Sequence, residues 1–160
     1  MEQLLQTHAE VAIALTGFAS VVAALRRPLT PLARQRFLSL LALSVIQIFG
    51  CLLPLWFIQQ LGAGDFGWRV LSAVLLLNLM RMRWLVLLPS RELGAAAVQA
   101  ILSPLVSRTV WATGLLGYLL FLLNIVGMPL QSGFDLYYAG LFSTLLVGFA
   151  LFADVAVADS

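Results

Sequence analysis

The sequence predicts an all-α membrane protein, a single domain in which about five helices cross the bilayer. The composition is the first observation behind this class: the 160 residues are 62% hydrophobic and only 10% charged, unlike a soluble domain. Secondly, apolar stretches long enough to cross a bilayer recur along the whole chain. Thirdly, the arginines gather on alternate connections between these stretches, as they do in the cytoplasmic loops of membrane proteins.

The longest uncharged stretch, residues 37–64, contains no Asp, Glu, Lys or Arg. Its apolar part, residues 37–61, makes a helix of about 37 Å, whereas the hydrocarbon layer is about 30 Å thick. We expect Pro54 to kink this helix in its outer third because proline removes a backbone donor. This stretch is the clearest predicted transmembrane helix.

Four further transmembrane helices are predicted at residues 4–25, 66–88, 109–130 and 134–153, separated by segments rich in Pro and Gly. The first is expected to be retained, because no basic region precedes it as in a secretory signal. Residues 90–107 are weakly apolar and flanked by Arg91 and Arg108. They predict a short interfacial helix on the cytoplasmic surface, or alternatively a buried connecting helix.

The arginines predict the orientation. All nine basic residues are Arg, and with five crossings and an external N-terminus only Arg69 lies outside. The eight arginines that then lie inside are Arg26, Arg27, Arg34, Arg36, Arg81, Arg83, Arg91 and Arg108. Since basic residues accumulate on the cytoplasmic side, the N-terminus is predicted outside and the C-terminus inside.

Three amide side chains, those of Gln47, Asn78 and Asn124, fall at mid-depth in three different predicted helices. An unpaired amide in hydrocarbon costs several kcal/mol, so each needs a partner. Hydrogen bonds between helices would supply one, and so would the polar lining of a water-filled path. These residues are therefore candidates for lining a pore or binding an ion.

Charged residues supply the other candidates. Glu10 is predicted near the outer edge of the hydrocarbon layer, where it would bind an ion or set the charge of an outer mouth together with Asp65, or simply reach water. Arg81 and Arg83 lie in the inner half of the third helix, where they either extend toward the surface or are buried in protein. They are candidates for an inner mouth or for contact with anionic lipid.

Small residues recur at every fourth position in the first and last predicted helices. Such stripes let two helix backbones approach closely. The predicted packing residues are Ala12, Thr16, Ser20 and Ala24 in the first helix, and Gly140, Thr144 and Gly148 in the last. Trp68, Tyr137 and Tyr138 are predicted at the outer membrane interface, which aromatic residues with a polar tip favour.

Several function classes are not expected. The single histidine is near the N-terminus, no nucleophile is paired with a base, and no glycine-rich phosphate loop occurs, so we expect no enzyme. Cys51 has no neighbour at metal-ligand spacing, so a packing role is expected, with no metal and no cofactor. The arginines flank apolar segments instead of forming a basic stripe, so no nucleic acid is expected either.

Several short motifs in the first half of the chain resemble those of a known group of proteins. They are Ala9-Glu10-Val11-Ala12, Thr16-Gly17-Phe18-Ala19, Ala23-Ala24-Leu25-Arg26-Arg27, Arg36, Leu53-Pro54-Leu55 and Trp68-Arg69. With them the first 85 residues or so resemble a group of short bacterial inner-membrane proteins to which no activity is assigned. The resemblance implies a multi-pass protein of the bacterial cytoplasmic membrane, and implies nothing about activity.

The expected function is a homo-oligomeric channel or pore for a small ion or solute. Five helices are too few to enclose a wide path alone, whereas small-residue stripes and single amides suit a bundle repeated by symmetry. The alternative is a non-catalytic accessory or scaffold subunit that docks on another membrane protein. In both cases the partners are the lipid bilayer and further membrane-embedded chains.

Overall fold

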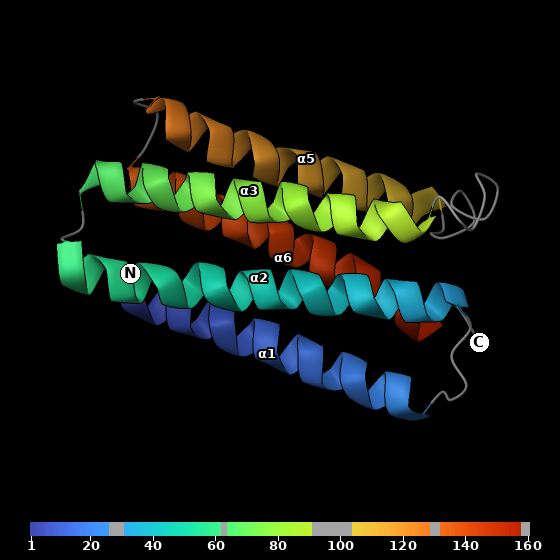
Figure 1. The fold of residues 1–160 in the computed structure, drawn as a ribbon. Helices are drawn as coiled ribbons and strands as arrows, with labels where there is room; N and C mark the ends of the chain where they lie inside the picture. The colour runs from blue at the N-terminus through green and yellow to red at the C-terminus, as the bar shows by residue number, and fades with distance from the viewer. Residues whose placement is uncertain (26–30, 62–63, 91–103, 129–131, 158–160) are drawn as a thin grey trace.

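The computed structural model describes residues 1–25, 31–61, 64–90, 104–128 and 132–157, which form five helices. They are α1 (Glu2–Leu25), α2 (Pro31–Leu61), α3 (Asp65–Ser90), α5 (Pro104–Val126) and α6 (Gly133–Val157). Neighbouring helices of this series run in opposite directions, so the bundle has two ends (Figure 1). We name them end A, where α1, α3 and α6 begin, and end B, where α2 and α5 begin.

Four of the described helices are long and apolar enough to cross a membrane, through Glu2–Val22, Phe37–Phe57, Arg108–Val126 and Gly133–Ala153. The prediction of an all-helical, multi-pass membrane protein is therefore confirmed at this level. The remaining helix, α3, is not one of the four, and its described part carries Asp65, Arg69 and Arg81. It nevertheless runs beside the others along the bundle (Figure 1).

Proline and glycine residues set the helix ends. Pro31 and Pro104 are the first residues of α2 and α5, where the missing N–H of proline costs no helical bond. α5 ends at Val126 because Gly127 adopts a φ of 73°, and the N–H of Met128 then bonds the Leu123 carbonyl at 3.2 Å.

Two predicted boundaries are accordingly wrong. The fourth transmembrane helix was expected to continue to residue 130, but the left-handed turn at Gly127 stops it at Val126. The expected interfacial segment was to include residues 104–107, but these form the first turn of α5. The rest of that segment, apart from Ser90 at the end of α3, lies outside the described residues.

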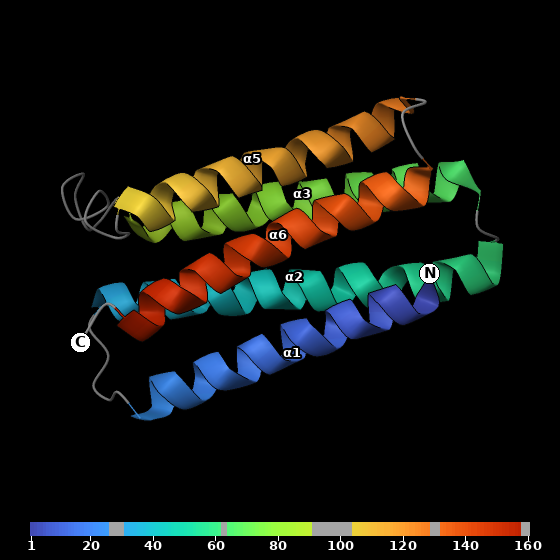
Figure 2. The same cartoon turned by 180° about the vertical axis from the view of Figure 1, so that it is seen from behind.

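The helix α6 is the centre of the bundle, because it packs against α1, α2, α3 and α5. Viewed from behind, it crosses between the pair α3 and α5 and the pair α1 and α2 (Figure 2). Its glycines permit the close approach: a Cβ on Gly140 would lie 2.7 Å from Cε1 of Phe121 in α5. On α2, a Cβ at Gly50 would lie 2.8 Å from Cδ2 of Leu141 in α6.

Near end A, aromatic side chains fill the interior between α3, α5 and α6. The ring of Trp68 lies 5.3 Å from that of Tyr137, and the ring of Phe121 lies 6.0 Å from it on another side. Tyr137 is fully buried and Trp68 is 4% exposed. The expectation that these two residues form an interfacial belt is wrong, because both pack inward. Tyr138 is partly buried, with its ring against His8.

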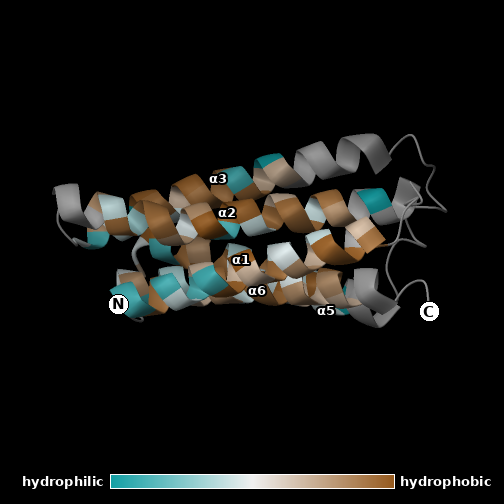
Figure 3. Cartoon of the chain, turned by 90° about the horizontal axis from the view of Figure 1, so that it is seen from below, coloured by the Kyte–Doolittle hydropathy of each residue, from teal (hydrophilic) through white to brown (hydrophobic). Residues whose placement is uncertain are grey.

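The outer surface of the bundle is apolar over most of its length. Phe18, Leu77 and Leu115 are among the many large hydrophobic side chains that are more than half exposed. Hydrophilic residues are concentrated in the first half of α1, as its colour shows (Figure 3). Such a surface suits hydrocarbon, and it leaves the few exposed polar residues as the features that call for an explanation.

Candidate functional site

Two sets of polar side chains stand out in the bundle: those bonded to other helices in the interior, and those exposed on the outside. The first set centres on Gln47 of α2, which is 2% exposed. Its Oε1 lies 2.8 Å from Nε2 of His8 in α1, and its Nε2 donates to the Thr144 hydroxyl and the Leu141 carbonyl of α6. One amide thus joins three helices.

The network also fixes the proton on His8. The Leu141 carbonyl can only accept, so the nitrogen of the Gln47 amide must face it and the oxygen must face His8. Nε2 of His8 therefore carries a hydrogen and donates it to Gln47. His8 is 3% exposed, and Tyr138 covers the ring edge to face, with centroids 5.8 Å apart.

A second amide, that of Asn124, also bonds to two neighbouring helices, near end A. Nδ2 of Asn124 in α5 lies 2.8 Å from Oγ of Ser72 in α3 and 2.9 Å from the carbonyl of Gly133, where α6 begins. It also lies 3.4 Å from the carbonyl of Trp68. Asn124 is buried, so its amide ties α5 to both neighbours without contacting solvent.

A third interior hydrogen bond replaces the helical bond that Pro54 removes from α2. Pro54 has no N–H, so the carbonyl four residues earlier, that of Gly50, lacks its helical donor. The hydroxyl of Tyr137 donates to this carbonyl at 2.6 Å. The pairing explains why α2 continues through Pro54 and why a tyrosine stands in the middle of the core.

The second set contains Glu10 of α1 and Asn78 and Arg81 of α3, which are all exposed. Nδ2 of Asn78 bonds the Val74 carbonyl of its own helix at 2.9 Å, which leaves its oxygen available. No described residue forms a hydrogen bond or ion pair with the carboxylate of Glu10 or the guanidinium of Arg81. Arg83, predicted beside Arg81, has a side chain outside the described part of the structure.

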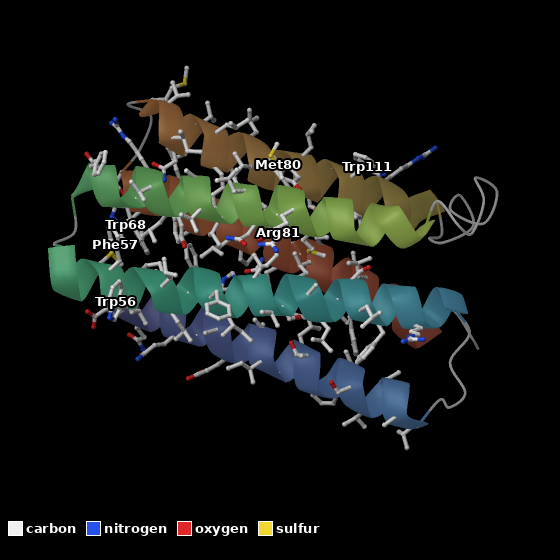
Figure 4. All side chains as sticks on the ribbon, viewed as in Figure 1. Trp56, Phe57, Trp68, Met80, Arg81 and Trp111 are labelled. Carbon is white, nitrogen blue, oxygen red and sulfur yellow. The ribbon has the colours of Figure 1, made fainter. Side chains whose placement is uncertain are left out.

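The interior bonds also show how far along the bundle these exposed residues lie. Asn124 bonds both Trp68 and Gly133, so the starts of α3 and α6 are level at end A. From Trp68, Asn78 lies about 15 Å and Arg81 about 20 Å along α3, at 1.5 Å per residue. Figure 4 places Arg81 on the side of α3 that faces α2.

Glu10 lies at a similar height on another helix. Its neighbour in α1, His8, is level with Leu141 and Thr144, which are about 12 and 16 Å along α6 from Gly133. Glu10 is two residues further, so it lies about 15 Å or more from end A. The sequence places Glu10 near the outer edge of the hydrocarbon layer, whereas the bundle places it near the middle of its length.

A groove of about 350 Å³ opens between α2 and α3, and Asn78 is the member of the exposed set that lines it. Tyr137 and Gly50 line it from within, and Phe49, Val74 and Asn78 are among the residues of its walls. Its lining is predominantly apolar, and Asn78 is the one amide in it. A helix side chain or another apolar group can occupy such a groove in a membrane.

The predicted packing residues are distributed unevenly. All three on α6, namely Gly140, Thr144 and Gly148, are buried. On α1, Ala12 is buried and Thr16 half-buried, but Ser20 and Ala24 are exposed. The hydroxyls of Thr16 and Ser20 bond the carbonyls of Ala12 and Thr16, four residues earlier on the same helix.

Sequence reasoning missed the interior roles of His8 and Tyr137. A signal for Tyr137 exists, since every proline inside a membrane helix frees one carbonyl that needs a donor. For His8 the signal is weaker: its spacing from Leu5, Ala12 and Leu15 places it on the buried face of α1. Nothing local in the sequence indicates that Gln47 is its partner.

Among the described residues, no group of three His, Cys, Asp or Glu side chains is placed to hold a metal ion. Comparisons with protein-family models, curated proteins and solved structures found no match for the chain. The geometry therefore defines a class, a multi-pass helical membrane protein with a bonded interior and a few exposed polar residues.

The bond between Tyr137 and Gly50 predicts a specific coupling. Tyr137→Phe should lower the free energy of unfolding by about 1–3 kcal/mol, because the Gly50 carbonyl is left buried and unpaired. In a Pro54→Ala background the loss should be smaller, since residue 54 then has an N–H for that carbonyl. Reversible unfolding in mixed detergent micelles measures both losses.

Tyr138→Phe is the matched control, because it keeps the ring against His8 and removes no hydrogen bond among the described residues. It should change stability little. An equal loss for Tyr137→Phe with and without Pro54 would contradict the pairing.

Proposed function

We propose that this chain is a subunit of a homo-oligomeric assembly in a bacterial cytoplasmic membrane, and that the assembly is a channel for a small ion or solute. The observation that carries the proposal is the exposed set, Glu10, Asn78 and Arg81, near the middle of the bundle. In hydrocarbon an unpaired charge or amide is costly, so these residues require partners outside the chain.

A path for an ion would run between copies and not through one chain. Gln47 and Asn124, two of the predicted lining residues, are buried and bonded within the chain. The exposed set, by contrast, is accessible from the surface of the bundle. A pore would thus take its polar groups from Glu10, Asn78 and Arg81 at the contacts between subunits.

The orientation is part of the proposal. All five helices would cross the bilayer, α3 included, with end A outside and end B in the cytoplasm. The charges support this: exposed Asp65 and Asp135 lie at end A with Arg69, whereas Arg34 and Arg108 lie near end B. The resemblance of residues 1–85 to bacterial inner-membrane proteins supports the location.

Thiol labelling tests the orientation. In a Cys51→Ala background, a cysteine introduced by Asp135→Cys should react with a membrane-impermeant reagent added to intact cells. One introduced by Arg34→Cys should react only after the membrane is opened. Labelling of position 34 in intact cells, with position 135 protected, would reverse the assignment.

Ion flux tests the channel. Liposomes containing the purified chain should conduct small ions. In the assemblies that Glu10→Gln still forms, the preference for cations over anions should be a few-fold lower, because the change removes a carboxylate from the contacts that line the path. Reversal potentials under an ion gradient measure this ratio. Glu2→Gln is the matched control, since Glu2 is exposed in the first turn of α1. Absence of flux for all ions tested would reject the channel.

A second candidate is a non-catalytic accessory subunit that docks on a different membrane protein. It is favoured by the apolar character of the remaining surface, which offers an aqueous path few polar groups. Recovery of one stoichiometric partner from native membranes, together with loss of that partner in Asn78→Leu and no flux in liposomes, would select it over the channel.

A further inference from the structure

We propose that copies of this chain contact each other through the outward face of α1 in one copy and the α2–α3 groove of the next, with Glu10 of the first paired to Arg81 of the second. This inference rests on the homo-oligomeric assembly proposed above and names its interface. The occupant of the groove is a second copy of this chain.

The directions of the two side chains are the first argument. At 100° per residue, Glu10 lies about 170° around α1 from the centre of the buried positions Leu5, His8 and Ala12. Arg81 lies about 150° around α3 from the centre of the buried positions of that helix, on the side toward α2 (Figure 4). Because α1 and α3 are separated by α2 in the bundle (Figure 1), the two charges face different neighbours.

The positions of Glu10 and Arg81 along the axis of the bundle are the second argument. Measured from the common level of Trp68 and Gly133, Glu10 lies about 15 Å or more along the bundle and Arg81 about 20 Å, and α1 and α3 run in the same direction. Copies in one membrane share their orientation, so a carboxylate and a guanidinium of neighbouring copies would meet at nearly the same depth. Each has the opposite charge that the other needs there.

The shape of α1 is the third argument. Beyond Glu10 its outward face carries Ala14 and Gly17 between the larger Ile13 and Val21, which are all exposed, and a Cβ added to Gly17 would meet nothing within 4 Å. A helix face with small residues can approach another backbone closely. It therefore fits against the groove, whose walls include Phe49, Val74 and Asn78, with Arg81 about one helical turn beyond Asn78 on α3.

The symmetry follows from using two different faces. A contact between unlike surfaces is head to tail, and where the rotation between copies closes, it gives a ring. For copies that share one orientation in a membrane, the axis of that ring is normal to the bilayer. Every copy then pairs its own Glu10 and its own Arg81 with neighbours. No mid-depth charge of the described residues remains in lipid, whereas a two-fold contact through one face would leave half of them unpaired.

Cross-linking tests the contact directly. Two differently tagged copies, one with Glu10→Cys and the other with Arg81→Cys, both in a Cys51→Ala background, are expressed together and oxidised in the membrane with copper phenanthroline. A disulfide-linked product carrying both tags is expected. The control pair, Glu2→Cys with Arg81→Cys, should give none, because Glu2 lies about 12 Å nearer to end A than Glu10.

Charge exchange tests the pairing. Glu10→Arg and Arg81→Glu should each weaken self-association about tenfold, and a chain carrying both changes should recover it. The neutral variants Glu10→Gln and Arg81→Gln give the same test with less risk to membrane insertion, and each should also weaken association. Full-length chains in lipid nanodiscs provide the measurement.

The outcomes separate this inference from the proposed function. A chain that remains oligomeric with no link between positions 10 and 81, and with no effect of the charge changes, overturns the interface and leaves the assembly standing. A chain that is monomeric in every form overturns both.

Discussion

The structure depends on one constraint: a polar group held among apolar helices must be bonded there. α6 meets this constraint for most of the bundle, because it contacts every other described helix and offers a hydroxyl or a carbonyl at each level. Tyr137 supplies the donor that Pro54 removes from α2, and Thr144 and Leu141 accept from Gln47. The interior polar bonds thus determine which helices are neighbours and how they are aligned.

The same constraint gives the exposed polar residues their significance. The interior amides of Gln47 and Asn124 are bonded within the chain, but Glu10 and Arg81 have no described partner. Because these interior amides all have hydrogen-bond partners, we expect the exposed polar side chains to have partners as well. We propose that their partners belong to other chains, and the proposals of assembly, channel and interface all follow from that step.

Much of the fold was predictable because its signals are local in the sequence. Uncharged stretches gave the helices, and proline and glycine gave their ends to within a few residues. The errors arose where a local signal was overridden. At Gly127 a single left-handed residue ended α5 four residues early, and Trp68 and Tyr137 turned inward although their type favours an interface.

The candidate site was less predictable, because the packing of the helices decides which polar side chains bond to each other, and this packing cannot be read from the sequence. The sequence identified Gln47, Asn78 and Asn124 as equivalent amides at mid-depth, yet two are buried and bonded and one is exposed. It predicted Glu10 near the outer edge of the hydrocarbon layer, whereas the structure places it nearer the middle of the bundle, since the length of α1 alone does not say which residue of α6 lies beside it. The hydrogen bond between His8 and Gln47 supplies that alignment.

The central claim is that the exposed polar residues require further copies of this chain. Counting photobleaching steps of a fluorescently tagged chain at low expression in native membranes measures it most directly. The account predicts particles with a fixed number of steps greater than one. Particles that bleach in a single step, at every expression level, would contradict it.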